Sequence, residues 1–446
     1  EVRQLDGFGE KTEQNILDGI ELLGQRTGRT RLGDAWRLAE DILVALAEVP
    51  GVVRTAPAGS LRRMRETVGD LDLLVASEDP APVMKRFRQL PQVGEVLLSG
   101  PTKTSIRTPE GFQVDLRVLE PQRWGTALQY FTGSQAHNVR LRGLALERGL
   151  SLSEYALKRE DGSEILCDSE EELYRTLGLP FIPPELREDR GEINAAQENR
   201  LPDLLELKDL HGDFQFHTTR SDGHHSLLAM ARAANAVGLE YALVTDHSHG
   251  LGIAGGLDVD RLREQQAEIA AVNEQLNGRF HVLSGIEVEV RGDGTLDLPD
   301  EVLSELDLVV AAVHGGLRQG QERVTARMLA AIRNPHVDII AHPTGRLIGE
   351  RQGGDFDMEA IFRAAAETGT ALEINAHPAR LDLDDVHARR AAELGVNLVV
   401  STDAHDIADF ALLRFGVATA RRGWITAVHV LNSRSLKSLL SWAARN

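Results

Sequence analysis

The amino-acid sequence predicts a multidomain protein of the α+β and α/β classes, in which a mixed front part precedes seven βα units that close into a barrel. Its 446 residues allow about three domains at roughly 150 residues each. Short strands with acidic residues alternate with amphipathic helices as far as residue 186. Beyond an acidic stretch at 187–209, apolar strands and helices follow with a repeat of roughly 25–40 residues, which is typical of parallel βα units.

The composition indicates a protein without a membrane partner. Charged residues make up 26% of the chain, and no apolar run approaches the ~20 residues of a membrane span. No signal peptide is visible, and the one cysteine, Cys167, has no internal disulfide partner, so we expect a cytoplasmic protein and a monomer. Because the chain begins at Glu1 without Met, we also expect that a segment upstream is missing.

Charge is distributed unevenly along the chain. The net charge of −19 argues at first against nucleic acid. Residues 1–150, however, hold 20 basic and 20 acidic residues, so the whole excess of acid lies further along. Basic clusters at 62–65 and 85–88 allow the front part to bind a phosphate backbone. The acidic back part suits metal ions better than DNA.

The chain opens on a glycine-rich turn within helical patterning. The segment Leu5–Thr12, with Gly7 and Gly9, resembles a helix-hairpin-helix turn, whose backbone N–H groups would bind a DNA phosphate. An ordinary turn between two helices is the alternative. Residues 32–49 then have the apolar spacing of an amphipathic helix.

A hydrophobic strand at 70–75 carries two aspartates on one face. Asp70 and Asp72 are two residues apart and therefore point the same way, while Leu71 and Leu73 point into a core. Adjacent carboxylates repel each other and are costly to desolvate unless a cation lies between them, and Mg²⁺ takes such oxygen ligands. The alternative is a strand whose solvent face happens to be acidic.

A third acid makes the metal site more specific. In the strand 112–118, Asp115 and Arg117 share the face opposite Val114 and Leu116. Two such strands can bring three carboxylates to one point, which is the ligand set that two-metal phosphoryl or nucleotidyl transfer requires.

An aromatic pair follows before a turn. Tyr130 and Phe131 precede a Thr-Gly-Ser turn at Gly133, which opens a basic helix with Asn138 and Arg142. The rings can stack on a sugar or base while the turn amides meet a phosphate. Buried aromatics beside a helix cap are the alternative.

Together these motifs resemble the family X DNA polymerases, with a core like that of DNA polymerase beta. The resemblance implies a nucleotidyltransferase-type palm with helical flanks. It covers about the first 190 residues and rests on motifs in the expected order: 58–75, 112–118, 130–134, 145–149, 153–155, 167–170 and 181–187.

The resemblance implies a role for each motif residue. Asp70, Asp72 and Asp115 would be catalytic and hold two Mg²⁺ or Mn²⁺ ions. Arg142 would contact gapped or primer–template DNA. Gln113 departs from the family pattern, which has Arg beside the third aspartate, so primer positioning is expected to be weaker. The incoming dNTP would contact Gly59, Ser60, Arg63, Gly69, Tyr130, Phe131, Gly133 and Asn138.

The second part has seven predicted strands, each followed by a helical pattern. A βα barrel gathers its active site at the C-terminal strand ends, so residues there are candidates for function. The strands are Phe214–His217, Ala242–Asp246, Val282–Glu287, Leu308–His314, Ile339–His342, Ala371–Asn375 and Asn397–Ser401.

Imidazoles and carboxylates follow these strands. A lone His at a strand end is more often structural, but eight such residues on one rim indicate a metal site, with Zn²⁺ or Mn²⁺ as suitable ions. Such a cluster would activate water for phosphoester hydrolysis. Its members are His217, Asp222, His247, Glu287, His314, His342, Asp403 and His405.

The phrases around these residues resemble the PHP (polymerase and histidinol phosphatase) domain, which bacterial family X polymerases carry at the C-terminus. The resemblance covers Leu210 to the end. The family has a His two residues before His217, where this chain has Gln215, so one of three expected metals would bind differently. Four further histidines are expected to be surface or supporting residues: His224, His225, His249 and His377.

The resulting hypothesis is a gap-filling DNA repair polymerase with a 3′→5′ exonuclease or phosphoesterase activity. Two alternatives stay open: a small-molecule nucleotidyltransferase fused to a histidinol-phosphatase-like enzyme, and a non-catalytic DNA-end binding module. The expected domains are a helix-hairpin-helix-like remnant, a palm, a nucleotide-selection and thumb subdomain, a linker and a PHP domain, at 1–32, 33–122, 123–186, 187–209 and 210–446.

Overall fold

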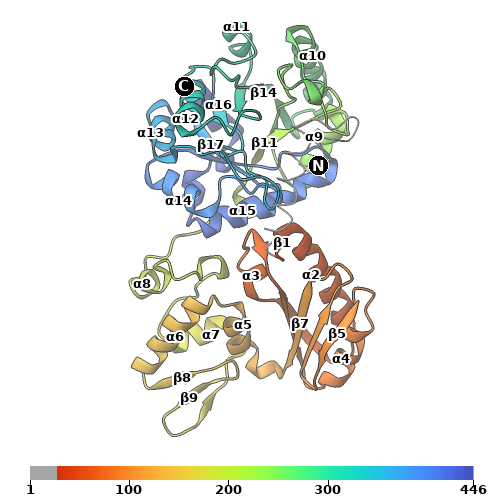
Figure 1. Ribbon diagram of the computed structural model, residues 1–446, viewed down its shortest axis with the longest axis vertical. Coiled ribbons are helices and arrows are strands. Elements are labelled where there is room, and N and C mark those ends of the chain that lie inside the picture. Colours follow the sequence, from red (N-terminus) through yellow and green to blue (C-terminus); the bar gives the residue numbers. More distant parts are fainter. Residues whose placement is uncertain (1–27, 445–446) are drawn as a thin grey trace, which may run out of the picture. The chain divides into compact units, whose positions relative to one another are not determined.

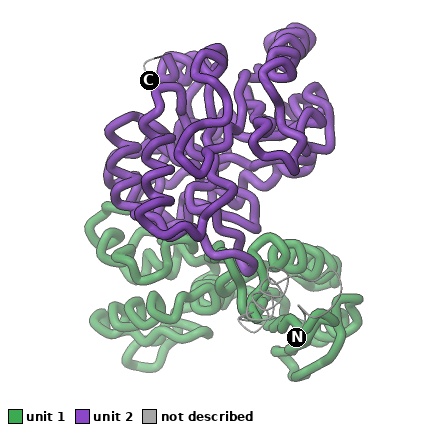
Figure 2. Tube along the Cα trace, turned by 45° about the horizontal axis from the view of Figure 1, so that its top comes forward, with its two compact units in different colours: residues 1–201 green, residues 202–446 purple. Residues whose placement is uncertain are grey.

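The computed structural model describes residues 28–444. It divides the chain into two compact units, unit 1 at 1–201 and unit 2 at 202–446 (Figure 2). The predicted helix-hairpin-helix residues Gly7 and Gly9 lie outside the described residues. Among the helices of residues 28–444, none is both long and apolar enough to cross a membrane.

Unit 1 is built around a five-stranded sheet in the order β2-β4-β7-β6-β5. β4 and β7 are parallel neighbours, whereas the other pairs are antiparallel. The register of β4 and β7 sets Asp72 directly opposite Asp115. The strands are β2 Val52–Pro57, β4 Leu71–Ser77, β5 Glu95–Ser99, β6 Lys103–Arg107 and β7 Gln113–Leu119.

Helices and two small antiparallel sheets complete unit 1 (Figure 1). The small sheets pair β1 Thr30–Arg31 with β3 Thr67–Val68, and β8 Leu150–Leu152 with β9 Leu157–Arg159 and β10 Glu164–Ile165. The helices are α2 Leu32–Ala47, α3 Gly59–Arg62, α4 Pro80–Arg88, α5 Trp124–Thr132, α6 Gln135–Glu147, α7 Glu170–Thr176 and α8 Glu192–Gln197.

Both faces of β4 are buried over most of its length. Leu73 and Val75 are fully buried on the face that the sequence predicts to be the core. Leu74 and Ala76, on the aspartate side, pack against Trp124 at the start of α5. The strand is therefore covered by α5 along its outer face, and only its first residues, at the aspartate end, remain beside a pocket.

Of the residues 187–209, assigned to a linker from their acidic composition, those at 187–200 are folded into unit 1. Arg187 is fully buried, and its Nη1 lies 2.5 Å from Glu170 Oε1. In α8, Glu192 is also buried and lies 2.7 Å from His137 Nδ1. Two charged residues of this stretch, Arg187 and Glu192, thus form buried pairs, which composition alone does not reveal.

The described part of unit 2, residues 202–444, contains eight parallel strands, one more than the sequence predicts. The predicted strand Val282–Glu287 is split at Ser284, whose backbone N–H and hydroxyl bond the Asp307 carboxylate. The strands are β11 Gly212–Phe216, β12 Tyr241–Val244, β13 His281–Leu283, β14 Gly285–Glu289, β15 Leu308–Ala312, β16 Ile339–Ile340, β17 Ala371–Asn375 and β18 Leu398–Ser401.

These strands form two sheets rather than one closed barrel, so the predicted closure is not observed. One sheet has the order β11-β12-β13 and the other β14-β15-β16-β17-β18. Isolated bridges join their ends, Phe216 to Ala404 and His247 to Glu287. Because β13 ends at the break beside Ser284, continuous pairing between the sheets stops there.

Helices surround the strands of unit 2 in Figure 1. One hydrophobic cluster, with Phe214, Leu243 and Val310, joins strands of both sheets and also includes Leu439 of the C-terminal helix α16. A larger cluster packs the other strand faces against the helices. The helices are α9 Leu227–Ala236, α10 Val259–Leu276, α11 Asp300–Leu303, α12 Gln321–Ile332, α13 Met358–Thr368, α14 Asp385–Glu393, α15 Leu413–Arg422 and α16 Leu436–Ala443.

Candidate functional sites

The aspartates of unit 1 border a pocket of about 710 Å³. Asp70 and Asp72 line it directly, and Asp115 stands beside Asp72 on the neighbouring strand. All the residues predicted to bind nucleotide line the same pocket, and so does Arg142. Sequence reasoning missed further lining residues from distant segments: Arg29, Arg65, Thr132, Gln135, Val139 and Glu188.

Asp72 lies where a negative charge on its carboxylate is disfavoured. Burial and the neighbouring charges of Asp70 and Asp115 raise its pKa to about 7. A carboxylate in this position binds a proton or a cation more readily than an isolated surface carboxylate does. The donor set therefore fits hard divalent cations, which take carboxylate oxygens as ligands.

Asp115 has the opposite environment. Burial would raise its pKa, but hydrogen bonds from Lys103, Gln113 and Ser105 outweigh burial and hold the pKa below its usual value. Lys103 Nζ lies 2.9 Å from Oδ2, and Gln113 Nε2 donates to Oδ1 at 2.9 Å. The side chain that departs from the family pattern thus still contacts the third aspartate. Lys103 gives no signal in the sequence, because it lies on a separate strand.

The turn before α3 brings backbone close to Asp72. Gly59 has a φ of +57°, and a Cβ there would lie 2.6 Å from Asp72 Oδ2, so another residue would collide with the carboxylate. Arg63 follows α3; its Nε lies 3.1 Å from Glu188 Oε1, and Nη1 donates to the carbonyl of Thr132. This arginine is therefore held against the turn that contains Gly133.

The aromatic pair is only partly exposed. The Tyr130 and Phe131 rings meet edge to face at 5.2 Å between centroids, and the Arg117 guanidinium lies 4.5 Å from the Phe131 centroid. Asn138 is fixed by a bond to the Tyr130 carbonyl at 2.7 Å and by Gln129. The preceding residue, His137, is buried and faces Glu192.

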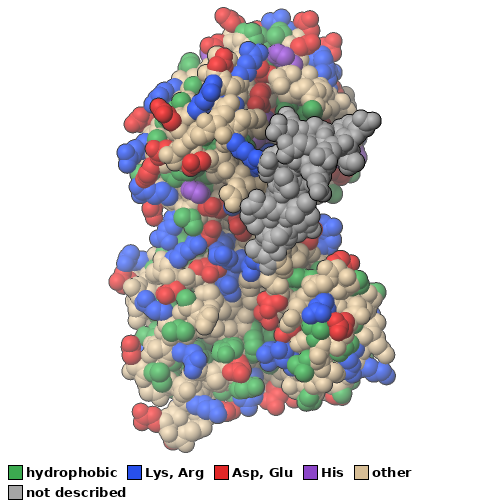
Figure 3. All heavy atoms as spheres, viewed as in Figure 1, with side chains coloured by type: hydrophobic (Ala, Val, Ile, Leu, Met, Phe, Trp, Pro, Cys, Tyr) green, Lys and Arg blue, Asp and Glu red, His purple; other side chains and the backbone are tan. Residues whose placement is uncertain are grey.

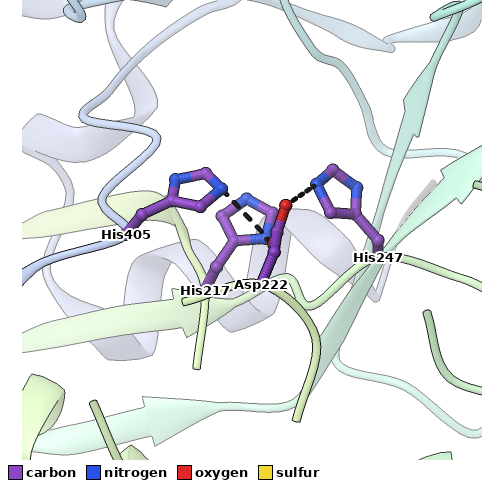
Figure 4. Close-up of side chains that lie close together, drawn as sticks. All are labelled: His217, Asp222, His247 and His405. Atoms are coloured by element: carbon purple, nitrogen blue, oxygen red, sulfur yellow. Dashed lines mark ion pairs between the residues drawn. The ribbon is translucent and has the colours of Figure 1, made fainter. Parts of the chain in front are cut away.

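The predicted ligands of unit 2 converge on the strand ends. Figure 4 shows Asp222 between His405 and His247, at 3.4 Å and 3.5 Å between the facing oxygen and nitrogen atoms. His217 stacks on His405 with ring centroids 4.2 Å apart. Ligand atoms of these four residues all lie within 4.8 Å of one another.

A second group shares His247. Glu287 lies 3.1 Å from His247 Nδ1, 3.3 Å from His314 Nε2 and 3.0 Å from His342 Nε2. The last predicted ligand, Asp403, lies 3.1 Å from His217 Nε2. The structure thus brings all eight predicted residues together.

The charge state of this cluster reflects close packing of acids and imidazoles. Burial opposes the charged form of His247, but Glu287 and Asp222 outweigh it and raise the pKa to about 11. Burial and the Arg380 charge lower the pKa of His342 to about 4.

Buried polar atoms without hydrogen-bond partners fit a metal centre. Among the described residues, His217 Nδ1, His342 Nδ1 and Gln215 Oε1 have none. Each of these atoms can coordinate a cation, and a buried polar atom is otherwise costly. Gln215, at the position where the family has His, points its amide toward the cluster, with Nε2 3.4 Å from Asp403 Oδ1.

The remaining histidines are further out. His224 is 69% exposed and His249 46% exposed, and each lies 3.7 Å from an aspartate oxygen. His225 lies 3.1 Å from Asp406, and His377 Nδ1 accepts a bond from the Ala379 amide. Sequence reasoning missed three residues beside the ligands: Glu373, Asn375 and Arg380.

On the face drawn in Figure 3, acidic and basic side chains are interspersed over unit 2. The excess of acidic residues in the C-terminal part of the sequence therefore does not form one continuous acidic patch on that face.

Known proteins resemble both units. The family model for the DNA polymerase beta thumb matches residues 127–188. The DNA polymerase/3′-5′ exonuclease PolX of Bacillus subtilis (strain 168) is 42% identical over 448 aligned residues, which cover 100% of this chain and 78% of that protein.

Relatives of a second kind match the C-terminal half. A probable phosphatase of Thermoanaerobacter sp. (strain X514) is 31% identical over 227 residues, covering 48% of this chain and 87% of that protein. A probable phosphatase of Acetivibrio thermocellus is 31% identical over 202 residues, covering 43% and 78%. Taken with the full-length match, these similarities identify the chain as a member of the bacterial family X DNA polymerases that carry a C-terminal PHP domain.

Proposed function

We propose that this chain extends primers in gapped or primer–template DNA with dNTPs, and that unit 2 removes nucleotides from DNA 3′ ends. The observation that carries the first part is the register of β4 and β7, which sets Asp72 opposite Asp115 beside a pocket lined by Ser60 and Arg63. The similarity to PolX along the whole chain supports DNA as the substrate over a small-molecule acceptor.

In the synthetic site the chain supplies position and charge. Asp70, Asp72 and Asp115 would hold two Mg²⁺ or Mn²⁺ ions, which supply Lewis-acid charge for an in-line displacement when bound. Ser60 and Arg63 would hold the nucleotide phosphates, so that the α-phosphate faces the primer 3′-OH and pyrophosphate leaves. Tyr130 and Phe131 would border the sugar.

In unit 2 the eight clustered residues would hold the ions of a PHP phosphoesterase. Mn²⁺ and Zn²⁺ suit a mixed set of imidazoles and carboxylates, and when bound they would lower the pKa of water for attack on a phosphodiester. We propose that the two parallel sheets represent an interrupted form of the PHP barrel. A 3′→5′ exonuclease is favoured over a phosphatase of small molecules by the resemblance to PolX.

Primer extension on gapped DNA tests the synthetic part. The Asp70→Asn plus Asp72→Asn variant is expected to lose nucleotide incorporation and to keep 3′ degradation. Undiminished synthesis would refute the assignment of these acids.

The matching test of unit 2 uses His342→Ala. This variant is expected to lose 3′ degradation in Mn²⁺ while it still extends a primer. A parallel loss of both activities would refute the assignment of separate sites. We place the protein in the cytoplasm, where a bacterial repair polymerase meets its DNA; its role in gap filling and its monomeric state remain predictions.

A further inference from the structure

We infer that Arg380 binds the scissile phosphate of the DNA 3′ end in unit 2. The inference rests on the proposed exonuclease function and assigns a substrate contact within that site. Arg380 is in the loop that follows β17, at the rim where the candidate metal ligands gather. Its side chain is 19% exposed, so the guanidinium is largely withdrawn from water.

The guanidinium is incompletely bonded. Nε lies 3.5 Å from Asp403 Oδ2, which is long for a hydrogen bond. Nη1 is buried and has no hydrogen-bond partner among residues 28–444. A buried, charged donor without a partner is costly, and such a group in a native protein is commonly completed by an ion, a water or a ligand.

Asp403 is engaged by other groups. Its Oδ1 faces His217 Nε2 at 3.1 Å, and its Oδ2 accepts from Asn375 Nδ2 at 3.2 Å. Asp403 therefore has hydrogen-bond partners other than Arg380 on both of its oxygens. A guanidinium beside it, with donors left over, has the fork geometry that suits two oxygens of a phosphate.

The loop holds Arg380 in place before any substrate arrives. Arg346 Nε donates to the carbonyl of Arg380 at 2.8 Å, and the amide of Ile348 donates to the carbonyl of Ala379 at 2.7 Å. The Asp382 carboxylate accepts from the amides of Thr344 and Gly345, which follow His342 in the chain. The loop carrying Arg380 is thus tied to the loop carrying a candidate ligand.

The nearby Arg351 differs from Arg380 in its hydrogen bonds. Arg351 directs Nε and Nη2 to the carbonyl of Gly345 at 3.1 and 2.7 Å, so it supports the backbone. Arg380 makes no such contact to a carbonyl among the hydrogen bonds of the described residues. Arg380 is therefore available to bind an anion, either a DNA phosphodiester or inorganic phosphate, which has the same chemistry.

Kinetics of 3′ degradation in Mn²⁺ test the inference on the full chain. Arg380→Ala is expected to lower kcat/KM about 100-fold, the scale of losing one donor to a transition-state oxyanion. Arg380→Lys keeps the charge without the fork and should lose about 10-fold. Arg279→Ala, an exposed arginine just before β13 at the opposite strand ends, is the matched control and should match the wild type.

Further measurements separate a substrate contact from a structural role. Mn²⁺ binding by calorimetry and primer extension by unit 1 should be unchanged in Arg380→Ala. Added guanidinium should restore part of the lost degradation, and inorganic phosphate should inhibit the wild type more strongly than the variant if free phosphate also binds there. Inhibition equal in both, with the loss of degradation kept, assigns the contact to the phosphodiester.

The inference is overturned if Arg380→Ala degrades 3′ ends at the wild-type rate, or if it loses Mn²⁺ binding together with activity. A wild-type chain that degrades no 3′ ends would instead refute the proposed function of unit 2, so the two failures can be told apart.

Discussion

Asp72 and Asp115 lie directly opposite each other on the parallel strands β4 and β7, and their environments differ sharply. Burial and two neighbouring acids raise the pKa of Asp72 to about 7, whereas Lys103 and Gln113 help to hold that of Asp115 low against the effect of burial. The negative charge of Asp72 is thus disfavoured unless a cation binds, whereas the charge of Asp115 is already stabilised by its neighbours.

The strain at Asp72 predicts a gain in stability when its charge is removed. Because the pKa of Asp72 in the folded state is above its ordinary value of 3.8, the protonated side chain contributes stability at pH values below 3.8. This contribution is lost as the pH rises through about 7. At pH 8 with a chelator, Asp72→Asn should therefore be more stable to unfolding by about 2 kcal/mol, while losing synthesis. Thermal unfolding of the full chain at pH 5 and pH 8 checks this.

The exposed Glu110→Gln serves as the control for this prediction and should change neither property. An Asp72→Asn variant less stable than the wild type at pH 8 would show that the carboxylate is not strained.

The buried ion pairs of unit 1 predict acid sensitivity. Burial disfavours the Glu170 carboxylate, but Arg187 and Arg62 outweigh it and lower the pKa to about 2. Stability from this group is present above the ordinary value of 4.5 and is lost as pH falls toward 2. Glu170→Gln should cost about 3 kcal/mol at pH 7, because it leaves buried arginines unpaired.

The difference between Glu170→Gln and the wild type should shrink as pH falls from 4.5 toward 2. Denaturant unfolding across this range measures it. A constant difference would mean that packing, rather than charge, accounts for the loss.

Substitution of Gln215 is expected to change which metal ion the site in unit 2 prefers. Its amide oxygen is buried, unpartnered within the described part of the chain and near Asp403. Gln215→His would offer an imidazole nitrogen instead, so affinity for Zn²⁺ should rise by about 10-fold or more relative to Mn²⁺. Competitive metal titration measures the ratio; an unchanged ratio would mean that position 215 does not face the ion.

The sequence predicted the site positions well where regular structure dictates them. Asp70, just before β4, and Asp72 within it line one pocket, as the period of two of a strand predicts. His342 lies just beyond a strand end, where parallel strands bring their C-termini together. The sequence missed Lys103 and Arg380, whose relation to the sites depends on sheet order and on a loop conformation. The break at Ser284 was also missed, since the apolar pattern continues across it.

Substitution of Arg63 is expected to weaken nucleotide binding. It is held by Thr132 and Glu188 and lines the pocket, where we propose that it contacts the nucleotide phosphates. Arg63→Ala should raise the KM for dNTP about 10- to 100-fold, because a charge-assisted contact is lost. Steady-state insertion kinetics measure this, with Arg159→Ala of β9, an exposed residue outside the pocket, as the control. An unchanged KM would exclude a phosphate contact.

Anomalous diffraction from crystals of the full chain soaked in Mn²⁺ tests the two-centre account most directly. The account predicts peaks beside Asp72 and Asp115 in unit 1, and among His217, Asp222, His247 and His405 in unit 2, with a further peak beside Glu287 and His314. Peaks in only one unit, or away from these residues, would contradict it.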